Sequence, residues 1–221
     1  MTAQFQTPAG PSFRDFRHRR WTLRPQAAEP RDVVLEEMNH RWFNALQVLS
    51  NSLKSLRRPD GLSATLDERV ARIDFQIRAM AALHRRLARP PAQNQTLETY
   101  CHALCIDLLL AFGREEIRPW VTMGDIAVSP ATSVRVGALV VELLTNALKH
   151  GRAPAEGGAV WISMRRLGGG RLELTAADSF PAPTEEAVCP RMIEGLVARL
   201  GGDLSVQTET GYMTRIRFPA S

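Results

Sequence analysis

The sequence predicts an α+β protein in which a helical hairpin precedes a sandwich of helices on one face of a mixed sheet. In the first half, two long segments repeat apolar residues at alternating spacings of three and four, which is typical of one helix face. In the second half, helical segments alternate with short strands placed to pair as hairpins. Arg89-Pro90-Pro91-Ala92 separates the halves, so we expect domains at residues 30–90 and 91–221.

The composition is that of a globular protein: 44% of the 221 residues are hydrophobic and 23% are charged. No apolar run approaches the roughly 20 residues of a membrane span, and the first residues lack a signal-peptide core. The three cysteines are too few for a disulfide framework, which favours a reducing compartment. We therefore expect a cytoplasmic protein.

Residues 1–29 are expected to form a basic leader, with five arginines between positions 14 and 24 contributing to the net charge of +5. Such a segment can contact nucleic acid, an anionic membrane or an acidic partner. It contains too few apolar residues to build a core, which favours a solvated, flexible tail. Nucleic-acid binding is not expected.

The hairpin is predicted from two helices, at about 32–56 and from Thr65 onward. Thr65 and Glu68 form a capping box at the start of the second helix. Its apolar stripe, with four-three spacing, consists of Leu66, Val70, Ile73, Ile77, Met80, His84 and Leu87. A lone hairpin cannot bury both stripes, so it dimerises into a four-helix bundle or packs on the rest of the chain. A homodimer is the simpler solution.

The sandwich is predicted to contain helices at 96–112, 129–150 and 184–200, because capping residues or glycines bound these segments. Strands are predicted at 117–123, 159–166, 171–177, 203–208 and 212–218. The first strand should lie at an edge of the sheet, because Pro119 cannot donate a backbone hydrogen bond.

His40 lies on the flank of the first predicted helix, beside its apolar stripe, with Asn44 one turn later and Glu37 almost one turn earlier. An imidazole is a neutral nucleophile near pH 7, and a nearby carboxylate or amide can hold its tautomer. The alternative is an ordinary surface histidine. The string Glu37-Met38-Asn39-His40-Arg41-Trp42-Phe43-Asn44 resembles the phosphoacceptor box of the HRxxN histidine kinases, the HisKA_2 and HWE-like group. The resemblance implies that His40 accepts phosphate, with Glu37 and Asn44 orienting it.

A second group of polar residues ends the helix predicted at 129–150: Glu142, Asn146, Lys149 and His150. Their spacing puts them on or near one side of the helix, where a carboxylate, an amide oxygen and two cations suit a magnesium triphosphate. The alternative is a solvated helix end that favours cations by its dipole.

Val141–Gly151 resembles the N box of the GHKL ATP-binding fold, and Leu172–Asp178 resembles the strand that enters its G1 box. The resemblance covers about residues 31–219. It implies ATP and Mg²⁺ as cofactors, with Asn146 as the Mg²⁺ ligand and Glu142 as a catalytic residue. It also implies that Asn146, Lys149, His150 and Asp178 bind the nucleotide.

The sequence departs from this family at its glycines. The G1 pattern Asp-x-Gly-x-Gly reads Asp178-Ser179-Phe180-Pro181-Ala182, and Cys189 stands where the second box has a glycine. Only residues 183–188 separate the boxes, which leaves almost no ATP lid. Phe180 and Pro181 are expected to crowd the approach to the nucleotide.

Three functions remain open. A histidine phosphotransferase or weak kinase would exchange phosphate between His40 and aspartates of response-regulator receivers, with an upstream kinase or sensor as a further partner. The lack of an input module in this sequence favours it. An ATP-dependent kinase is favoured by the retained Glu142, Asn146 and Lys149. A dimeric adaptor would bind partners without phosphorylation of His40.

Overall fold

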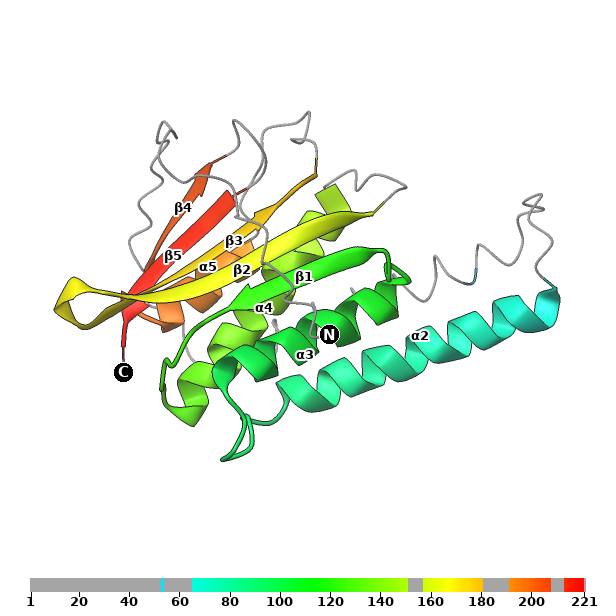
Figure 1. Ribbon diagram of the computed structural model, residues 1–221, viewed down its shortest axis with the longest axis horizontal. Coiled ribbons are helices and arrows are strands. Elements are labelled where there is room, and N and C mark those ends of the chain that lie inside the picture. The colour runs from blue at the N-terminus through cyan, green and yellow to red at the C-terminus, as the bar shows by residue number, and fades with distance from the viewer. Residues whose placement is uncertain (1–52, 54–64, 151–156, 181–190, 208–212, 221) are drawn as a thin grey trace, which may run out of the picture.

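The computed structural model describes residues 53, 65–150, 157–180, 191–207 and 213–220, and shows an α+β fold (Figure 1). The element order is α2 (Leu66–Leu87), α3 (Leu97–Phe112), β1 (Ile117–Thr122), α4 (Pro130–His150), β2 (Gly158–Leu167), β3 (Arg171–Asp178), α5 (Arg191–Arg199), β4 (Asp203–Gln207) and β5 (Met213–Pro219). A short 3₁₀ turn, Gly168–Gly170, joins β2 to β3. The first predicted helix lies outside the described residues except for Leu53, which is helical.

The sheet is mixed, as predicted, with the strand order β1-β2-β3-β5-β4. β1 pairs in parallel with β2, and the other three pairs are antiparallel. Pro119 lies in the edge strand β1, as its missing N–H requires. The glycine turn closes the β2–β3 hairpin because Gly169 and Gly170, at φ 73° and 69°, adopt the left-handed conformation open to glycine.

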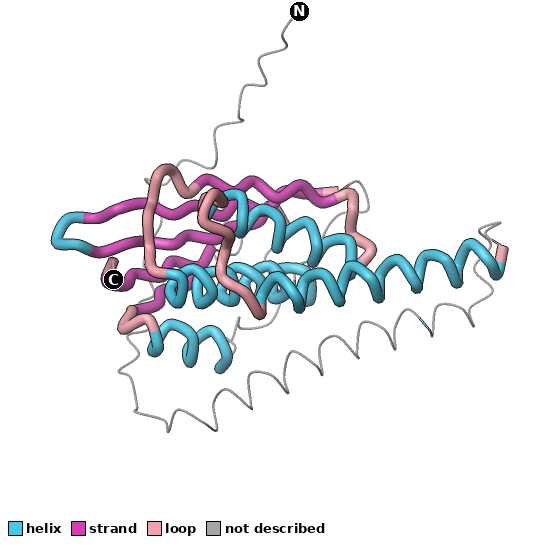
Figure 2. The backbone as a smooth tube through the Cα atoms, turned by 90° about the horizontal axis from the view of Figure 1, so that it is seen from below, coloured by secondary structure: helices cyan, strands magenta, loops and turns pink. Residues whose placement is uncertain are grey.

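Helices α3, α4 and α5 cover one face of the sheet, and α2 packs on the side of α3 remote from it (Figures 1 and 2). One hydrophobic core runs from the sheet through α4 and α3 to the second half of α2. Pro130–Lys149 is long and apolar enough to cross a membrane, but 83% of its most apolar window is buried inside the fold. That burial is typical of a domain's core helix. The predicted α+β architecture is therefore confirmed.

The ends of the helices follow from local capping. Glu68 N donates to the side chain of Thr65 at 3.3 Å while Thr65 N donates to Glu68 Oε2 at 2.7 Å, which is the predicted capping box. α3 ends at Gly113, whose φ is 62°. Thr132 N donates to Ser129 Oγ at 3.2 Å at the start of α4.

The face that α2 buries differs from the predicted stripe. Its buried residues are Ile73, Gln76, Ala79, Met80, Leu83 and Leu87. Leu66, Val70 and Ile77 remain 65%, 51% and 45% exposed. Among the described elements, α2 extends beyond α3, so it is the second half of α2 that packs on a described helix (Figure 1). The second half of α2 therefore buries its apolar face on the rest of the chain, which is one of the two arrangements expected for the hairpin.

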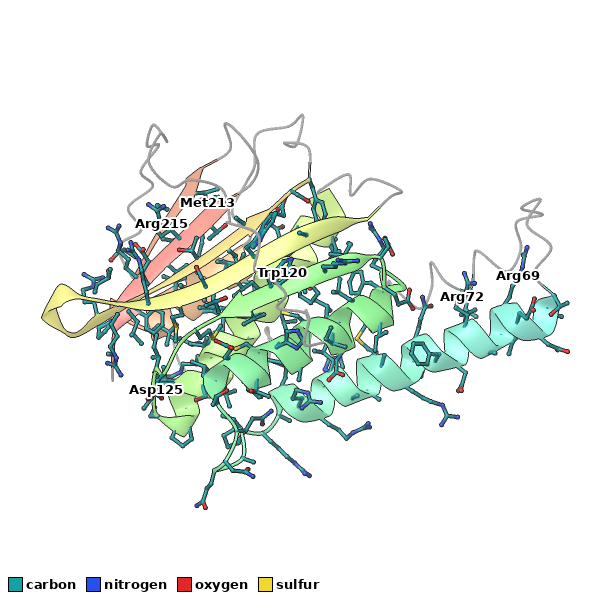
Figure 3. All side chains as sticks on the ribbon, viewed as in Figure 1. Arg69, Arg72, Trp120, Asp125, Met213 and Arg215 are labelled. Carbon is teal, nitrogen blue, oxygen red and sulfur yellow. The ribbon has the colours of Figure 1, made fainter. Side chains whose placement is uncertain are left out.

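The open face of the sheet carries a buried carboxylate. Glu173 on β3 is 2% exposed and receives hydrogen bonds from Arg165 Nη2 at 2.6 Å and from Arg217 Nε at 2.7 Å. Arg215 Nε lies 3.8 Å from the same carboxylate, and its side chain is labelled in Figure 3. Burial opposes ionisation of Glu173, but the arginine hydrogen bonds outweigh it and lower its pKa. The network ties β2, β3 and β5 together.

Candidate functional site

Among the buried polar residues of α4, a mainly apolar helix, are a carboxyl and an amide near its carboxyl end. Glu142 and Asn146 are each 7% exposed and lie one turn apart. Burying polar groups has a free-energy cost, so a fold seldom retains them where packing alone would serve. Lys149 is exposed near the end of the same helix. The side chain of His150 lies outside the described set, so its expected role stays a prediction.

Asp178 is the last residue of β3, and its Oδ1 accepts a hydrogen bond from the backbone N–H of Phe180 at 3.0 Å. Burial raises the pKa of this carboxyl to about 6, against the opposing effect of that hydrogen bond. At neutral pH the carboxyl is mostly ionised and can accept hydrogen bonds. A partly buried carboxyl with a shifted pKa is typical of a functional position.

The carboxyl ends of α4 and β3 lie at the same end of the sandwich (Figure 1). The two elements are in contact, and β2, which follows α4, pairs Val160 with Asp178. The fold thus brings Asn146 and Asp178, predicted from separate motifs, to one end of the domain. A carboxylate suits the amino group of an adenine, and an amide oxygen suits Mg²⁺. The chemistry of these donors fits a magnesium nucleotide.

The residues after Asp178, which stand where the family pattern has glycines, hold this segment against β2. Ser179 bonds twice to β2, with its N–H donating to Ala159 O and its Oγ accepting from Ala159 N, both at 3.0 Å. The ring of Phe180 is 2% exposed and packs against Gly158. A Cβ on Gly158 would lie 2.6 Å from Phe180 Cε1, so only glycine fits there. Sequence reasoning missed Gly158, because nothing in its local pattern indicates this distant contact.

The residues around the predicted phosphoacceptor, Glu37, His40 and Asn44, lie outside the described residues, as do Pro181 and Cys189. Their roles stay predictions. On α3, Cys101 and Cys105 are fully buried while His102 is exposed, so these three do not face a common site. His84 is half-buried on α2.

The fold is similar to that of solved histidine kinase cores. Among solved structures, the blue-light activated histidine kinase EL346 of Erythrobacter litoralis aligns with a TM-score of 0.53 at 22% identity, covering 89% of this chain and 62% of that one. Its separate histidine kinase domain aligns with a TM-score of 0.51 at 22% identity, covering 86% of this chain and 95% of the domain. These likenesses concern the fold.

Sequence comparison also finds histidine kinases. The HisKA_2 model, described as a histidine kinase, matches residues 37–112. Blue-light-activated histidine kinase 2 of Erythrobacter litoralis is 26% identical over 211 residues, covering 89% of this chain and 60% of that protein. The Brucella anthropi blue-light-activated histidine kinase is 25% identical over 203 residues, covering 86% of this chain and 38% of that protein. These matches support the resemblance to the HisKA_2-type histidine kinases, and the chain spans only part of these relatives' length.

Proposed function

We propose that this chain is a two-component phosphorelay protein that carries a phosphoryl group on His40 and exchanges it with aspartates of response-regulator receiver domains. It acts as a histidine phosphotransferase or a weak histidine kinase. The observation that carries the proposal is the family match, which begins at Glu37 and includes His40. Receivers are the partners that membership of a histidine kinase family implies.

The proposed chemistry is an in-line displacement on phosphorus. One ring nitrogen of His40 attacks, the bond from phosphorus to the donor oxygen breaks, and the donor leaves as a carboxylate or as ADP. The imidazole is left as a phosphoramidate once its other nitrogen gives up its proton to water. Glu37 and Asn44 are proposed to orient that second nitrogen. In such transfers most of the catalysis comes from positioning and charge neutralisation.

A weak kinase is proposed because the site keeps the side chains expected to bind the metal and the nucleotide, whereas the glycines of the family's G1 pattern are missing. Asn146 would hold the metal and Asp178 the adenine, with Glu142, Lys149 and His150 beside the phosphates. When bound, ATP with Mg²⁺ supplies the phosphoryl group and neutralises its charge. Ser179 is tied to β2 and Phe180 is packed on Gly158, so this backbone lacks the freedom that glycines give. Slow or weak nucleotide use follows.

A fully active ATP-dependent kinase is the second candidate. The observation that favours it is the burial of Glu142 and Asn146 in an apolar helix together with the raised pKa of Asp178. Positions of this kind are typical of sites retained for function. For either candidate we propose a cytoplasmic protein. We also propose a homodimer, because the exposed apolar residues Leu66, Val70 and Ile77 give α2 a surface that a second helix pair can cover.

Two transfer assays test the proposal. The full-length protein is incubated with radiolabelled ATP and Mg²⁺, and separately with a phosphorylated receiver, using His40→Ala as the matched control. The proposal predicts rapid loss of label from the receiver with wild type, none with His40→Ala, and slow labelling by ATP. Fast labelling by ATP would favour the active kinase. If wild type and His40→Ala drain the receiver equally, the phosphotransfer proposal is wrong and an adaptor role replaces it.

A further inference from the structure

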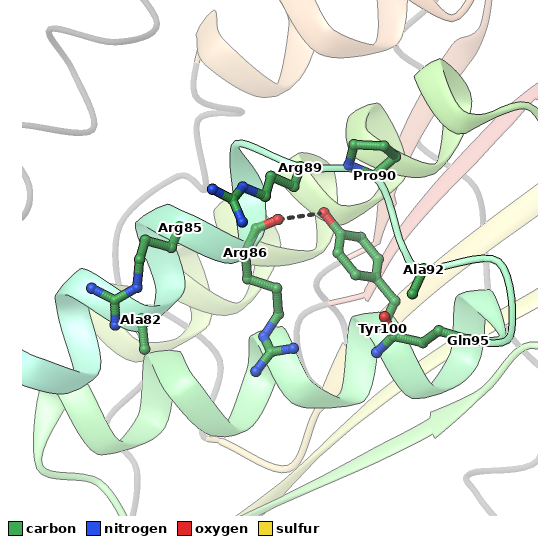
Figure 4. Close-up of a pocket in the computed structure, with 8 residues that line it drawn as sticks. All are labelled: Ala82, Arg85, Arg86, Arg89, Pro90, Ala92, Gln95 and Tyr100. Atoms are coloured by element: carbon green, nitrogen blue, oxygen red, sulfur yellow. Dashed lines mark hydrogen bonds between the residues drawn. The ribbon is translucent and has the colours of Figure 1, made fainter.

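A pocket of about 420 Å³ lies where α2 ends and the chain turns toward α3 (Figure 4). Arg85, Arg86 and Arg89 line it from α2 and the residues just beyond. Gln95 lines it from the connection and Tyr100 from the first turns of α3. Its volume is within the range of small-molecule sites, roughly 300–1,000 Å³. Three cationic side chains in one small pocket indicate a preference for anions.

The positive charge of this pocket is only partly neutralised. Arg86 Nε pairs with Asp107 Oδ2 on α3 at 2.9 Å. Arg85 and Arg89 are exposed, and the described residues provide neither with an ion-pair partner. Arg85 lies in the last turn of α2 and Arg89 just beyond its end, so both positive charges lie near the same end of the helix. The negative end of the helix dipole amounts to about half a charge and offsets only part of this excess.

The wall beneath the arginines is well ordered by hydrogen bonds. Tyr100 is 1% exposed, and its hydroxyl donates to the backbone oxygen of Arg86 at 3.3 Å. Gln95 N donates to Ala92 O at 2.9 Å, which closes a turn in the connection. The Arg86 carbonyl and the first turns of α3 are thereby held together. A ligand entering the pocket meets a preformed surface, which reduces the entropy cost of binding.

We propose that this pocket binds a small phosphate-bearing anion, with Arg85 and Arg89 as its principal charged contacts. The planar guanidinium fork matches the oxygen geometry of phosphate and can bind two oxygens at once. Gln95 also lines the pocket, and its side-chain amide can supply a neutral donor.

This pocket is separate from the candidate nucleotide site. It lies at the amino end of α3, whereas the carboxyl end of α3 leads into β1, whose first residue Ile117 pairs with Gly158 beside the Asp178 end of the sheet. The 16 residues of α3 separate the two ends, which corresponds to roughly 24 Å of helix. A bound anion would contact both α2 and the connection to α3, so it would hold the junction between the helix and the sandwich.

Isothermal titration of the full chain with pyrophosphate, at constant ionic strength and without Mg²⁺, tests the proposal. The test variant is Arg85→Gln/Arg89→Gln. Its control, Arg72→Gln/Arg78→Gln, removes the same charge from exposed positions earlier in α2 (Figure 3 labels Arg72). Wild type and control are expected to bind with a Kd of about 0.1–1 mM, and the test variant at least about tenfold more weakly. Thermal melts without anion verify that each variant is folded.

Three binding results would overturn the proposal. The first is equal binding by wild type, test variant and control, and the second is no wild-type binding below about 10 mM. The third is that Lys149→Gln loses binding while Arg85→Gln/Arg89→Gln keeps it, which would put pyrophosphate in the candidate nucleotide site. Citrate provides a carboxylate-only comparison, and binding as tight as that of pyrophosphate would contradict the phosphate preference. No phosphoryl transfer is measured, so the outcome is independent of the function proposed for His40.

Discussion

Replacing Asp178 with asparagine is predicted to stabilise the fold at neutral pH while weakening nucleotide binding. The carboxyl lies at the end of β3, where burial raises its pKa from 3.8 to about 6. Asparagine has nearly the same shape, and its side-chain oxygen can still accept the hydrogen bond from Phe180 N. The substitution therefore removes the charge with little change in packing.

The sign and size of the effect follow from proton linkage. Because the folded-state pKa lies above the unfolded value, the folded protein binds the proton more tightly, and stability falls as the pH rises from about 4 to about 6. A shift of about two units corresponds to about 3 kcal/mol. Solvent screening of the partly exposed carboxyl reduces this figure. We expect Asp178→Asn to gain about 1–3 kcal/mol at pH 7 and almost nothing below pH 4.

Urea denaturation of both proteins between pH 4 and pH 8 measures this difference. Asp125→Asn, at an exposed aspartate labelled in Figure 3, is the matched control and should show no comparable gain. The free energy of unfolding of Asp178→Asn should exceed that of wild type by an amount that grows as the pH rises to about 7. An equal or lower stability of Asp178→Asn at pH 7, or a gap that does not vary with pH, would refute the reasoning.

Glu173→Gln should lower the free energy of unfolding by about 2 kcal/mol at pH 7, because three arginines lose their shared carboxylate. The lowered pKa means that this loss shrinks as the pH falls below the ordinary range of a glutamate, as urea titrations at pH 7 and pH 3 would show. Gly158→Ala should cost about 1–3 kcal/mol through its clash with a buried ring. Gly195→Ala in α5, where a Cβ meets nothing within 4 Å, should gain up to about 1 kcal/mol, and thermal melts compare the two. Burial raises the pKa of Cys101, and that of Cys105 to about 12, so neither should react with a thiol reagent before unfolding. Rapid labelling of the native Cys189→Ser variant, which keeps only Cys101 and Cys105, would contradict that prediction.

Element ends were predictable from the sequence because their causes are local. Thr65 and Ser129 cap the helices that follow them, and Gly113 ends α3. Pro119 indicated an edge strand for a reason that needs only its missing N–H. Each signal lies within a few residues of the structure that it determines.

Features that depend on distant packing were harder to predict. The spacing of α2 fits more than one face, and the position of α3 selects the one that buries Gln76 and Leu83. The contact of Phe180 with Gly158 depends on the register of β2 against β3. The pKa of Asp178 depends on how much of the fold surrounds it. The candidate site was predicted as separate motifs, and the fold brings Asn146 and Asp178 to one end.

The central claim is that His40 carries the phosphoryl group. Mass spectrometry of the full-length protein, digested at neutral to alkaline pH after incubation with a phosphorylated receiver, tests it most directly. The account predicts a phosphohistidine on the peptide that contains His40 and no phosphorylated histidine in His40→Ala. Phosphate found on another residue, or on none with any receiver or with ATP and Mg²⁺, would contradict it.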